Sequence, residues 1–169
     1  MVNACHLPPP GESSLSNWVI ATEDFGISST YPIHKNHRVG SAYGMRLHPV
    51  TGKNTMHYGH DIPCKKGTPI RTVASGEVTR SEHSVTGGNL IEVTHYGKNP
   101  VHTRYLHLHR RHVRKGETVT KGQRIGSCGS TGRSTGPHLH FEVLVNGNPI
   151  PPLILEQKVE KEWDVLYGF

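Results

Sequence analysis

The sequence has no apolar run that approaches the roughly 20 residues of a transmembrane helix, so we expect no membrane insertion. Its first ten residues, MVNACHLPPP, contain neither a basic segment nor an apolar one, and we therefore expect no signal peptide. On this interpretation the protein is made in the cytoplasm and leaves it by another route.

Aromatic residues are scarce, at 7% of the chain, whereas glycine (19) and proline (12) are frequent. This balance favours a domain of short strands and many turns over a helical bundle. With 169 residues, the chain is long enough for one domain with a substantial hydrophobic core.

Cysteine is also scarce, with three residues at Cys5, Cys64 and Cys128. An odd number at wide spacing does not form a disulfide framework, so we expect reduced, buried thiols rather than a bridge. No Cys-x-x-Cys pair occurs, which argues against a structural zinc site.

Acidic residues are outnumbered by basic ones, 13 to 19, and the net charge is +6 with histidine neutral. A basic surface suits nucleic acid, anionic lipid or a polyanionic cell-wall polymer. No zinc-finger, helix-turn-helix or aromatic-plus-basic pattern is present, so we expect no nucleic-acid partner.

Short apolar and β-branched segments, separated by turn residues, predict a mainly β protein built on an antiparallel sheet or barrel-like sheet with few short helices. The predicted strands cover residues 68–74, 76–80, 89–95, 101–108, 113–119, 123–128 and 139–145. We expect an N-terminal arm or extension at 1–38 that packs on the core, a main domain at 39–150, and a C-terminal tail at 151–169 with a short helix near 155–163.

The 14 histidines include the triplet His138-Leu139-His140 at the start of a predicted strand. Side chains alternate along a strand, so both histidines point to the same face, with Cα atoms about 6.6 Å apart. Such a pair can provide a metal ligand and a neighbouring acid or base. The residues alone do not decide which histidine has which role.

The segment His57-Tyr58-Gly59-His60-Asp61 offers further ligands. On a straight strand His57 and Asp61 would lie about 13 Å apart, whereas zinc needs bonds near 2 Å, so the chain must curl at Gly59. His60 is an alternative ligand. His57, Asp61 and one histidine of the triplet would leave a fourth position open for water, as a catalytic zinc site requires.

A third group is Tyr105-Leu106-His107-Leu108-His109. Strand alternation predicts that Tyr105, His107 and His109 share one face, with Leu106 and Leu108 on the other. His107 is then a further candidate for catalysis.

Taken together, segments between residues 39 and 150 resemble the M23 family of zinc peptidases, the lysostaphin/LytM-type peptidoglycan endopeptidases. The segments that carry the resemblance are, in the order of the family, GMRLHP, HYGHD, KKGTPI, GGNLIEVTH, YLHL and VTKGQRIGSCGSTGRSTGPHLHFEV. The resemblance implies a LytM-type β domain with an open cleft.

By the same resemblance, one Zn²⁺ ion is bound by His57, Asp61 and His140, and His107 and His138 are the catalytic histidines that do not bind the metal. The implied activity is hydrolysis of the stem or bridge peptides of bacterial peptidoglycan. We expect a monomer that reaches the cell wall as a phage lysin or as a virion-associated hydrolase. The alternative is a non-catalytic wall-binding module or a structural part of a virion.

Arg46 matches a signature that flanks the cleft in this family. Three residues depart from the family pattern: His60 and Cys64 near the metal ligands, and His109 after the YLHL segment. Glu142 follows His140 on the same strand face, where it either orients that ligand or is simply a surface carboxylate.

Overall fold

The computed structural model describes residues 32–33, 38–47, 52–97 and 100–152. These residues form twelve β-strands and, within the described ranges, no helix. The helix expected near residues 155–163 lies outside them. No helix that is long and apolar enough to cross a membrane occurs in the described part of the chain.

The strands follow one another in short lengths. In chain order they are β1 (Gly44–Leu47), β2 (Asn54–His57), β3 (His60–Pro63), β4 (Pro69–Arg71), β5 (Gly76–Ser84), β6 (Gly88–His95), β7 (Val101–Leu108), β8 (Arg110–Arg111), β9 (Thr118–Val119), β10 (Arg124–Ser127), β11 (His138–Val145) and β12 (Asn148–Ile150). The predicted strands at 68–74 and 113–119 are shorter in the structure, where only β4 and β9 form.

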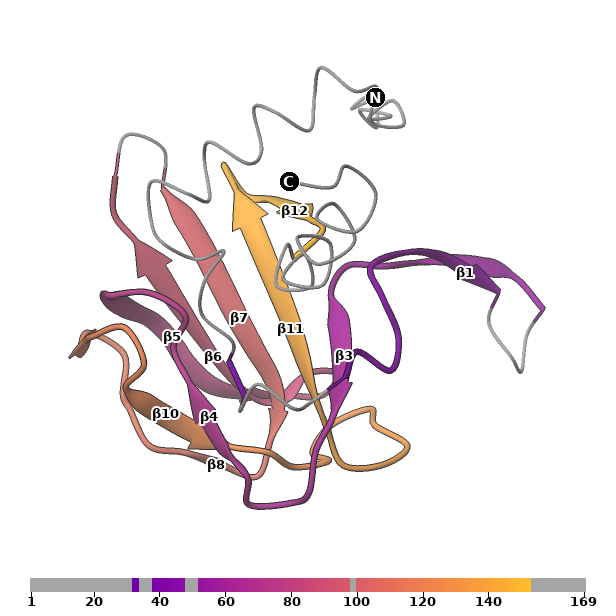
Figure 1. Ribbon diagram of the computed structural model, residues 1–169, viewed down its shortest axis with the longest axis horizontal. Helices are drawn as coiled ribbons and strands as arrows, with labels where there is room; N and C mark the ends of the chain where they lie inside the picture. Colours follow the sequence, from indigo (N-terminus) through magenta and orange to yellow (C-terminus); the bar gives the residue numbers. More distant parts are fainter. Residues whose placement is uncertain (1–31, 34–37, 48–51, 98–99, 153–169) are drawn as a thin grey trace, which may run out of the picture.

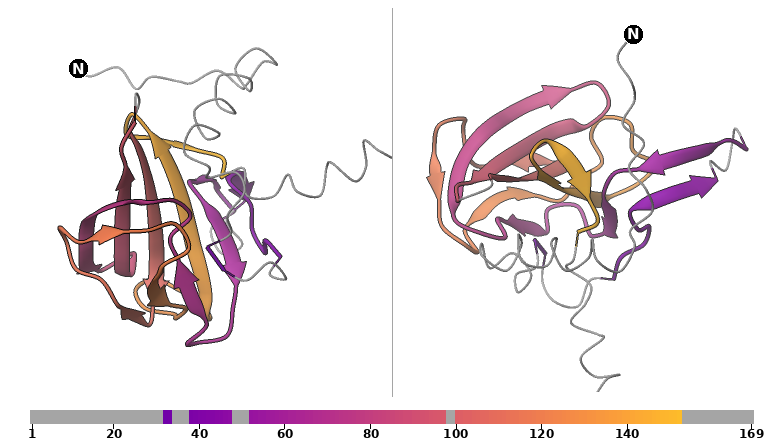
Figure 2. Two further views of the ribbon diagram at one scale, coloured as in Figure 1. Left: turned by 60° about the vertical axis from the view of Figure 1, so that its left-hand side comes forward. Right: turned by 90° about the horizontal axis from the view of Figure 1, so that it is seen from above.

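Three antiparallel sheets organise these strands. The largest has the order β12-β11-β7-β6-β5-β9, with β3 also paired to β11. A smaller sheet, β4-β10-β8, lies over one face of the large sheet, and the β1–β2 hairpin projects to the side (Figures 1 and 2). The strand order is open, so the described strands form a layered sheet rather than a closed barrel.

The hydrophobic core lies between the large and the small sheet. Tyr105 of β7 and Phe141 of β11 are opposite each other in the register, are fully buried, and have ring centroids 5.2 Å apart. Ile70 of β4 and Ile125 of β10 cover them from the small sheet. The Tyr105 hydroxyl accepts a hydrogen bond from the Val73 amide at 3.1 Å, so its polar atom is satisfied inside the core.

The core also contains a disulfide bond between Cys64 and Cys128, whose Cα atoms are 6.3 Å apart. The expectation of reduced thiols was therefore wrong. Backbone hydrogen bonds from Gly67 to Cys128 (2.9 Å) and from Cys128 to Thr68 (2.8 Å) bring the two segments together. A pairing across 64 residues leaves no spacing signal in the sequence. Cys5 lies outside the described residues.

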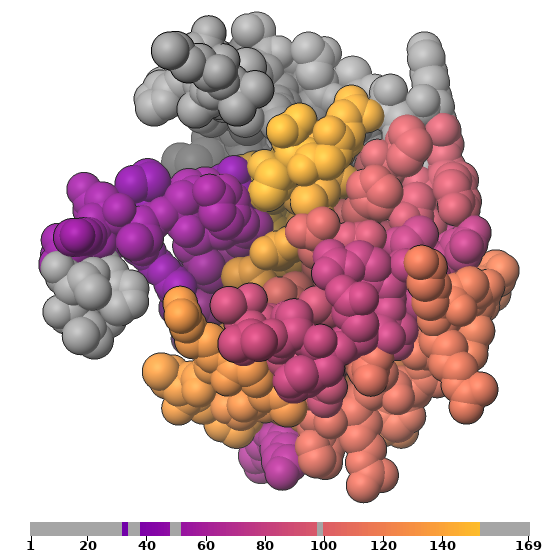
Figure 3. All heavy atoms as spheres, turned by 180° about the vertical axis from the view of Figure 1, so that it is seen from behind, coloured from indigo at the N-terminus to yellow at the C-terminus, as the bar shows by residue number. Residues whose placement is uncertain are grey.

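The other face of the large sheet is polar. Glu92 of β6, Arg104 of β7 and Glu142 of β11 occupy adjacent strands on this face, and Arg104 forms an ion pair with each glutamate. Figure 3 shows the molecule from this side. The surface is hollowed beside β11 (yellow), between the β1–β3 segment (purple) and the loops in pink and orange.

Candidate active site

The first candidate ligands come from the turn between β2 and β3. His57 is the last residue of β2, and β3 begins at His60. Because β3 pairs with β11, Asp61 lies opposite His140. A Cβ atom on Gly59 would lie 2.4 Å from the Phe141 carbonyl oxygen and 2.9 Å from His140 Nε2. Only glycine fits this turn, and the curl predicted at Gly59 is confirmed.

Three ligand atoms meet at this point. His57 Nε2 lies 3.2 Å from His140 Nδ1 and 3.1 Å from Asp61 Oδ1, and His140 Nδ1 lies 2.7 Å from Asp61 Oδ1. Tetrahedral ligands that bind zinc at about 2.0–2.1 Å are about 3.3 Å apart, so the three atoms are close to the spacing that one ion needs. The group can hold a metal ion and leaves a further coordination position for another ligand.

The remaining atoms of the three side chains are held by the protein. His57 Nδ1 donates to the Ala42 carbonyl oxygen at 2.7 Å, and His140 Nε2 donates to Glu142 Oε1 at 3.1 Å. Arg46 Nη1 lies 3.4 Å from Asp61 Oδ2. These contacts orient the rings and leave His57 Nε2, His140 Nδ1 and Asp61 Oδ1 directed toward one another, where they could hold an ion.

Glu142 is in turn part of a network on the polar face of the sheet, so it is not an isolated surface carboxylate. Arg104 donates to Glu142 Oε2 at 3.3 Å and to Glu92 Oε2 at 2.6 Å, and Thr79 donates to Glu92 Oε1 at 3.0 Å. Burial raises the pKa of Glu142, but the hydrogen bond from His140 and the charge of Arg104 outweigh it, and the pKa lies below its usual value. The charged carboxylate orients His140.

The electrostatics of the group favour a positive charge between the ligands. Burial raises the pKa of Asp61, but hydrogen bonds from His140 and His57 outweigh it and hold the pKa far below its usual range. Burial lowers the pKa of His140, but Asp61 and Glu142 outweigh it and raise the pKa to about 9. A metal ion would take the place of the proton that His140 holds between these carboxylates.

The two candidate catalytic histidines lie beside this group. His107 Nδ1 donates to the Thr131 carbonyl oxygen and His138 Nδ1 donates to the Gly136 carbonyl oxygen, both at 2.8 Å. The two rings are 4.8 Å apart between centroids, and the His107 ring is 6.0 Å from the His140 ring. His138 Nε2 also lies 3.7 Å from Asp61 Oδ1, so the pair borders the ligand group, and Nδ1 of each ring is engaged by the backbone while Nε2 faces the cleft.

Burial also sets the protonation of His107. It lowers the pKa of His107, and the hydrogen bond to the Thr131 carbonyl offsets this only in part. The ring is neutral at neutral pH, and its unprotonated Nε2 can accept a proton.

The prediction that Tyr105, His107 and His109 share one face of the strand is wrong for Tyr105 and His107. Tyr105 lies in the core, whereas His107 lies with His138 on the cleft side. The register between β6 and β7 shifts where Asn89 pairs with residue 108 and Ile91 with Tyr105, so β7 contains one extra residue, and His107 has a φ of 60°. This β-bulge turns His107 toward the cleft.

His60, the alternative ligand, is directed elsewhere. Its Nδ1 accepts a hydrogen bond from the Tyr43 amide and its Nε2 donates to the Pro152 carbonyl oxygen, both at 2.9 Å. Both ring nitrogens are therefore occupied. The carbonyl groups of Ala42, Thr131 and Gly136 that orient the other histidines could not be recognised from the sequence, because every residue has such a group.

Residues 55–152 match the family model described as Peptidase family M23. The chain belongs to peptidase family M23. The M23 domain contains all five residues proposed from the sequence, three in the ligand group and two beside it. The family resemblance and the mainly β fold expected from it are confirmed.

Relatives and solved structures agree with this assignment. The chain is 43% identical to the peptidoglycan DD-endopeptidase ShyA of Vibrio cholerae over 121 residues, which are 71% of this chain and 28% of the relative. A zinc-containing peptidase from Vibrio cholerae matches with a TM-score of 0.69 and 38% identity, over 76% of this chain and 39% of that one. The catalytic domain of lysostaphin from Staphylococcus simulans matches with a TM-score of 0.64 and 36% identity, over 70% and 90%. The match thus spans little more than a quarter of ShyA's length.

Proposed function

We propose that this M23 domain is a zinc-dependent endopeptidase that hydrolyses peptide cross-links of bacterial peptidoglycan. The observation that carries the proposal is the meeting of His57 Nε2, Asp61 Oδ1 and His140 Nδ1 within 3.2 Å of one another, beside two histidines whose Nδ1 atoms are held by backbone carbonyls. The similarity to a peptidoglycan DD-endopeptidase and to a zinc-containing peptidase supports the substrate and the metal.

In this proposal His57, Asp61 and His140 hold one zinc ion. Zinc at such a site would lower the pKa of a bound water to about 7 and would polarise the carbonyl group of a substrate. His107, which is neutral, accepts a proton through Nε2 and can return it to the leaving amine. His138, with its Nδ1 proton on the Gly136 carbonyl, presents a second Nε2 that can donate to or accept from the reacting groups.

For the bond, we propose the link between D-alanine and diaminopimelate rather than a glycine bridge. The name of ShyA as a DD-endopeptidase, at 43% identity, supports this choice. We further propose that the protein acts as a monomer outside the cytoplasm. The Cys64–Cys128 disulfide supports the location, because such bonds persist mainly in oxidising compartments. Release as a phage lysin or virion component stays a prediction.

Mass spectrometry of muropeptides after digestion of purified peptidoglycan tests the proposal. We expect D-alanine–diaminopimelate cross-linked dimers to disappear and monomers to accumulate, with about one zinc ion in each active protein. His140→Ala should lose both the metal and the products. Intact dimers after digestion with the zinc-loaded protein would refute the activity, and products from glycine bridges would reassign the bond.

A further inference from the structure

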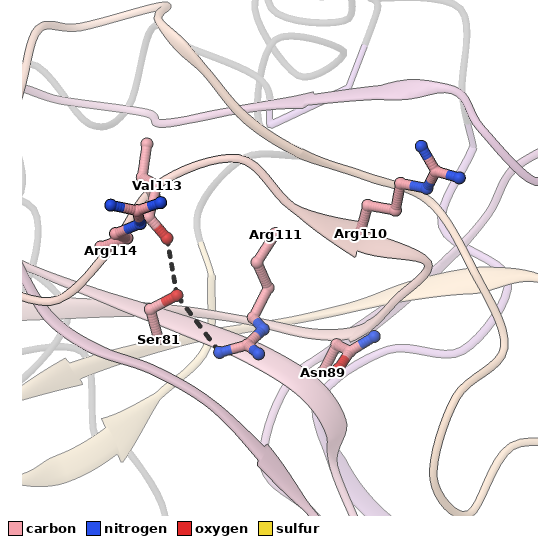
Figure 4. A pocket seen from close by; sticks show the side chains of 6 residues that line it. All are labelled: Ser81, Asn89, Arg110, Arg111, Val113 and Arg114. Carbon is pink, nitrogen blue, oxygen red and sulfur yellow. Dashed lines mark hydrogen bonds between the residues drawn. The ribbon is translucent and has the colours of Figure 1, made fainter.

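A second hollow lies away from the metal ligands, at the end of β5 and β6 where β8 crosses them. It has a volume of about 430 Å³. Its lining residues are Ser81, Asn89, Arg110, Arg111, Val113 and Arg114 (Figure 4). None of them belongs to the metal group or to the catalytic pair, so the cleavage reaction does not explain this pocket.

Three arginines and no acidic residue line the pocket. In the part of the chain that the structure describes, Arg110, Arg111 and Arg114 form none of the observed ion pairs. Arg111 Nη1 makes one long contact of 3.4 Å with Ser81 Oγ, whose own proton is donated to the Val113 carbonyl oxygen at 2.7 Å. Most of the Arg111 donors are thus left for a ligand.

The surroundings reinforce the positive charge. Residues 110–124 contain six lysines and arginines and one acidic residue, Glu117. Burial, together with the positive charges of Arg124 and Arg110, lowers the pKa of the exposed His112. The excess of basic residues in this segment favours an anionic ligand.

The three arginines are spread along the pocket rather than gathered at one point. In Figure 4, Arg111 reaches down between Ser81 and Asn89, Arg114 lies at one end, and Arg110 extends away at the other end. This arrangement suits an extended ligand with several separated negative charges better than one small anion.

The pocket is joined to the catalytic loop through Asn89. The Asn89 amide donates to Thr131 Oγ1 at 2.9 Å, and the Thr131 carbonyl oxygen accepts the proton of His107 Nδ1. The Asn89 side chain also donates to the carbonyl oxygens of Leu108 and His109, both at 3.1 Å. A ligand in the pocket is therefore held in a fixed relation to the catalytic histidine.

We propose that this arginine pocket binds the free carboxylates of peptidoglycan stem peptides that neighbour the cross-link being cleaved. Stem peptides that are not cross-linked end in carboxylates and recur along each glycan strand, which provides separated negative charges. Guanidinium groups pair with carboxylates through two parallel hydrogen bonds. The pocket then retains the enzyme on its polymeric substrate, and this assignment rests on the proposed function.

The test compares binding to insoluble peptidoglycan that has been stripped of phosphate polymers. The variant is Arg110→Gln/Arg111→Gln/Arg114→Gln, and the matched control is Arg38→Gln/Lys65→Gln/Lys66→Gln, which removes the same charge from exposed positions elsewhere. Both are made in a His107→Ala background, so that the substrate stays intact. We expect the pocket variant to bind about tenfold or more weakly, and the control to bind like the parent.

Two further measurements identify the ligand and separate this proposal from the activity. The His107→Ala parent should bind weakly to peptidoglycan whose carboxylates have been amidated. This binding should be as weak as that of the pocket variant to untreated peptidoglycan. With His107 restored, the pocket variant should cleave a soluble cross-linked dimer at the parental rate and intact peptidoglycan more slowly. Equal binding by the pocket and control variants would overturn the proposal, and so would a loss confined to phosphate polymers or nucleic acid. Failure of the unmodified enzyme on the soluble dimer would instead refute the proposed function.

Discussion

His107 combines a strained backbone with a functional position. Its φ of 60° lies in the left-handed region, which costs a residue other than glycine about 1–3 kcal/mol. The backbone groups of His107 are nevertheless paired, since its amide donates to the Gly87 carbonyl at 2.8 Å and its carbonyl accepts from Thr131 at 3.4 Å. The strain is therefore maintained by the surrounding loops, and it places the imidazole in the cleft rather than in the core.

The His107→Ala substitution tests this role. Because His107 is not one of the three proposed metal ligands, we expect turnover of a soluble cross-linked dimer to fall by about 10²- to 10⁴-fold while zinc stays bound. Rate measurements together with metal analysis check both parts. His112→Ala, an exposed histidine away from the cleft, is the control and should retain full turnover. Undiminished turnover in His107→Ala would remove this residue from the mechanism.

His140 makes the metal-free protein sensitive to pH. Its pKa in the folded state is raised to about 9, from about 6.5 when unfolded, by Asp61 and Glu142. The resulting stability, up to about 3 kcal/mol, is fully present below about pH 6.5 and is lost as pH rises through about 9. The pKa of Asp61 is lowered in the folded state, so the contribution of Asp61 to stability is present above about pH 4 and is lost as pH falls further.

Unfolding of the metal-free protein, followed by denaturant titration between pH 6 and 10, measures this effect. The unmodified protein should lose stability over this range, whereas His140→Gln should start less stable and show a flatter profile. Zinc competes with the same proton, so zinc affinity should rise with pH up to about 9. A stability of the metal-free protein that does not change between pH 6 and 10 would contradict the proposed pairing.

At the scale of strands and turns, the sequence predicted most of what positions the metal ligands. The alternation in β11 and the curl at Gly59 could be foreseen, because both follow from local geometry. The bulge at His107 could not, since one extra residue in β7 depends on how β6 pairs with it. The same holds for the disulfide, which depends on the meeting of segments 64 residues apart.

The Cys64–Cys128 bond ties the segment that follows β3 to the loop that precedes β11. Closing a loop of this length in the unfolded chain accounts for about 4 kcal/mol. We therefore expect Cys64→Ser/Cys128→Ser to unfold at a clearly lower denaturant concentration, with a similar loss when the unmodified protein is reduced. Val85→Ala, at an exposed side chain, is the control and should leave the midpoint unchanged. Equal midpoints for the unmodified protein, the double cysteine variant and the control would show that the bond contributes nothing to stability.

At the scale of the whole molecule, the fold assigns different tasks to the two faces of the large sheet. One face and the small sheet enclose the core, which includes Tyr105 and Phe141. The other face carries the network of Glu92, Arg104 and Glu142 that ends at His140, a candidate metal ligand. The ligand group thus lies on a polar surface whose opposite side is rigidly packed, which is the support that a site of fixed geometry needs.

This packing also includes Ile33, which precedes the main domain predicted to begin at residue 39. Ile33 is only 2% exposed and belongs to the core cluster, and the Arg71 amide donates to the Pro32 carbonyl oxygen at 2.9 Å. We expect Ile33→Ala to destabilise the protein by about 2–5 kcal/mol in denaturant unfolding. Val85→Ala, at a side chain that is 90% exposed, should change stability by less than about 0.5 kcal/mol. Because Ile33 belongs to the core cluster and not to the ligand group, the folded fraction of Ile33→Ala should still bind zinc in full stoichiometry. An effect as small as that of Val85→Ala would mean that this segment contributes little to the core.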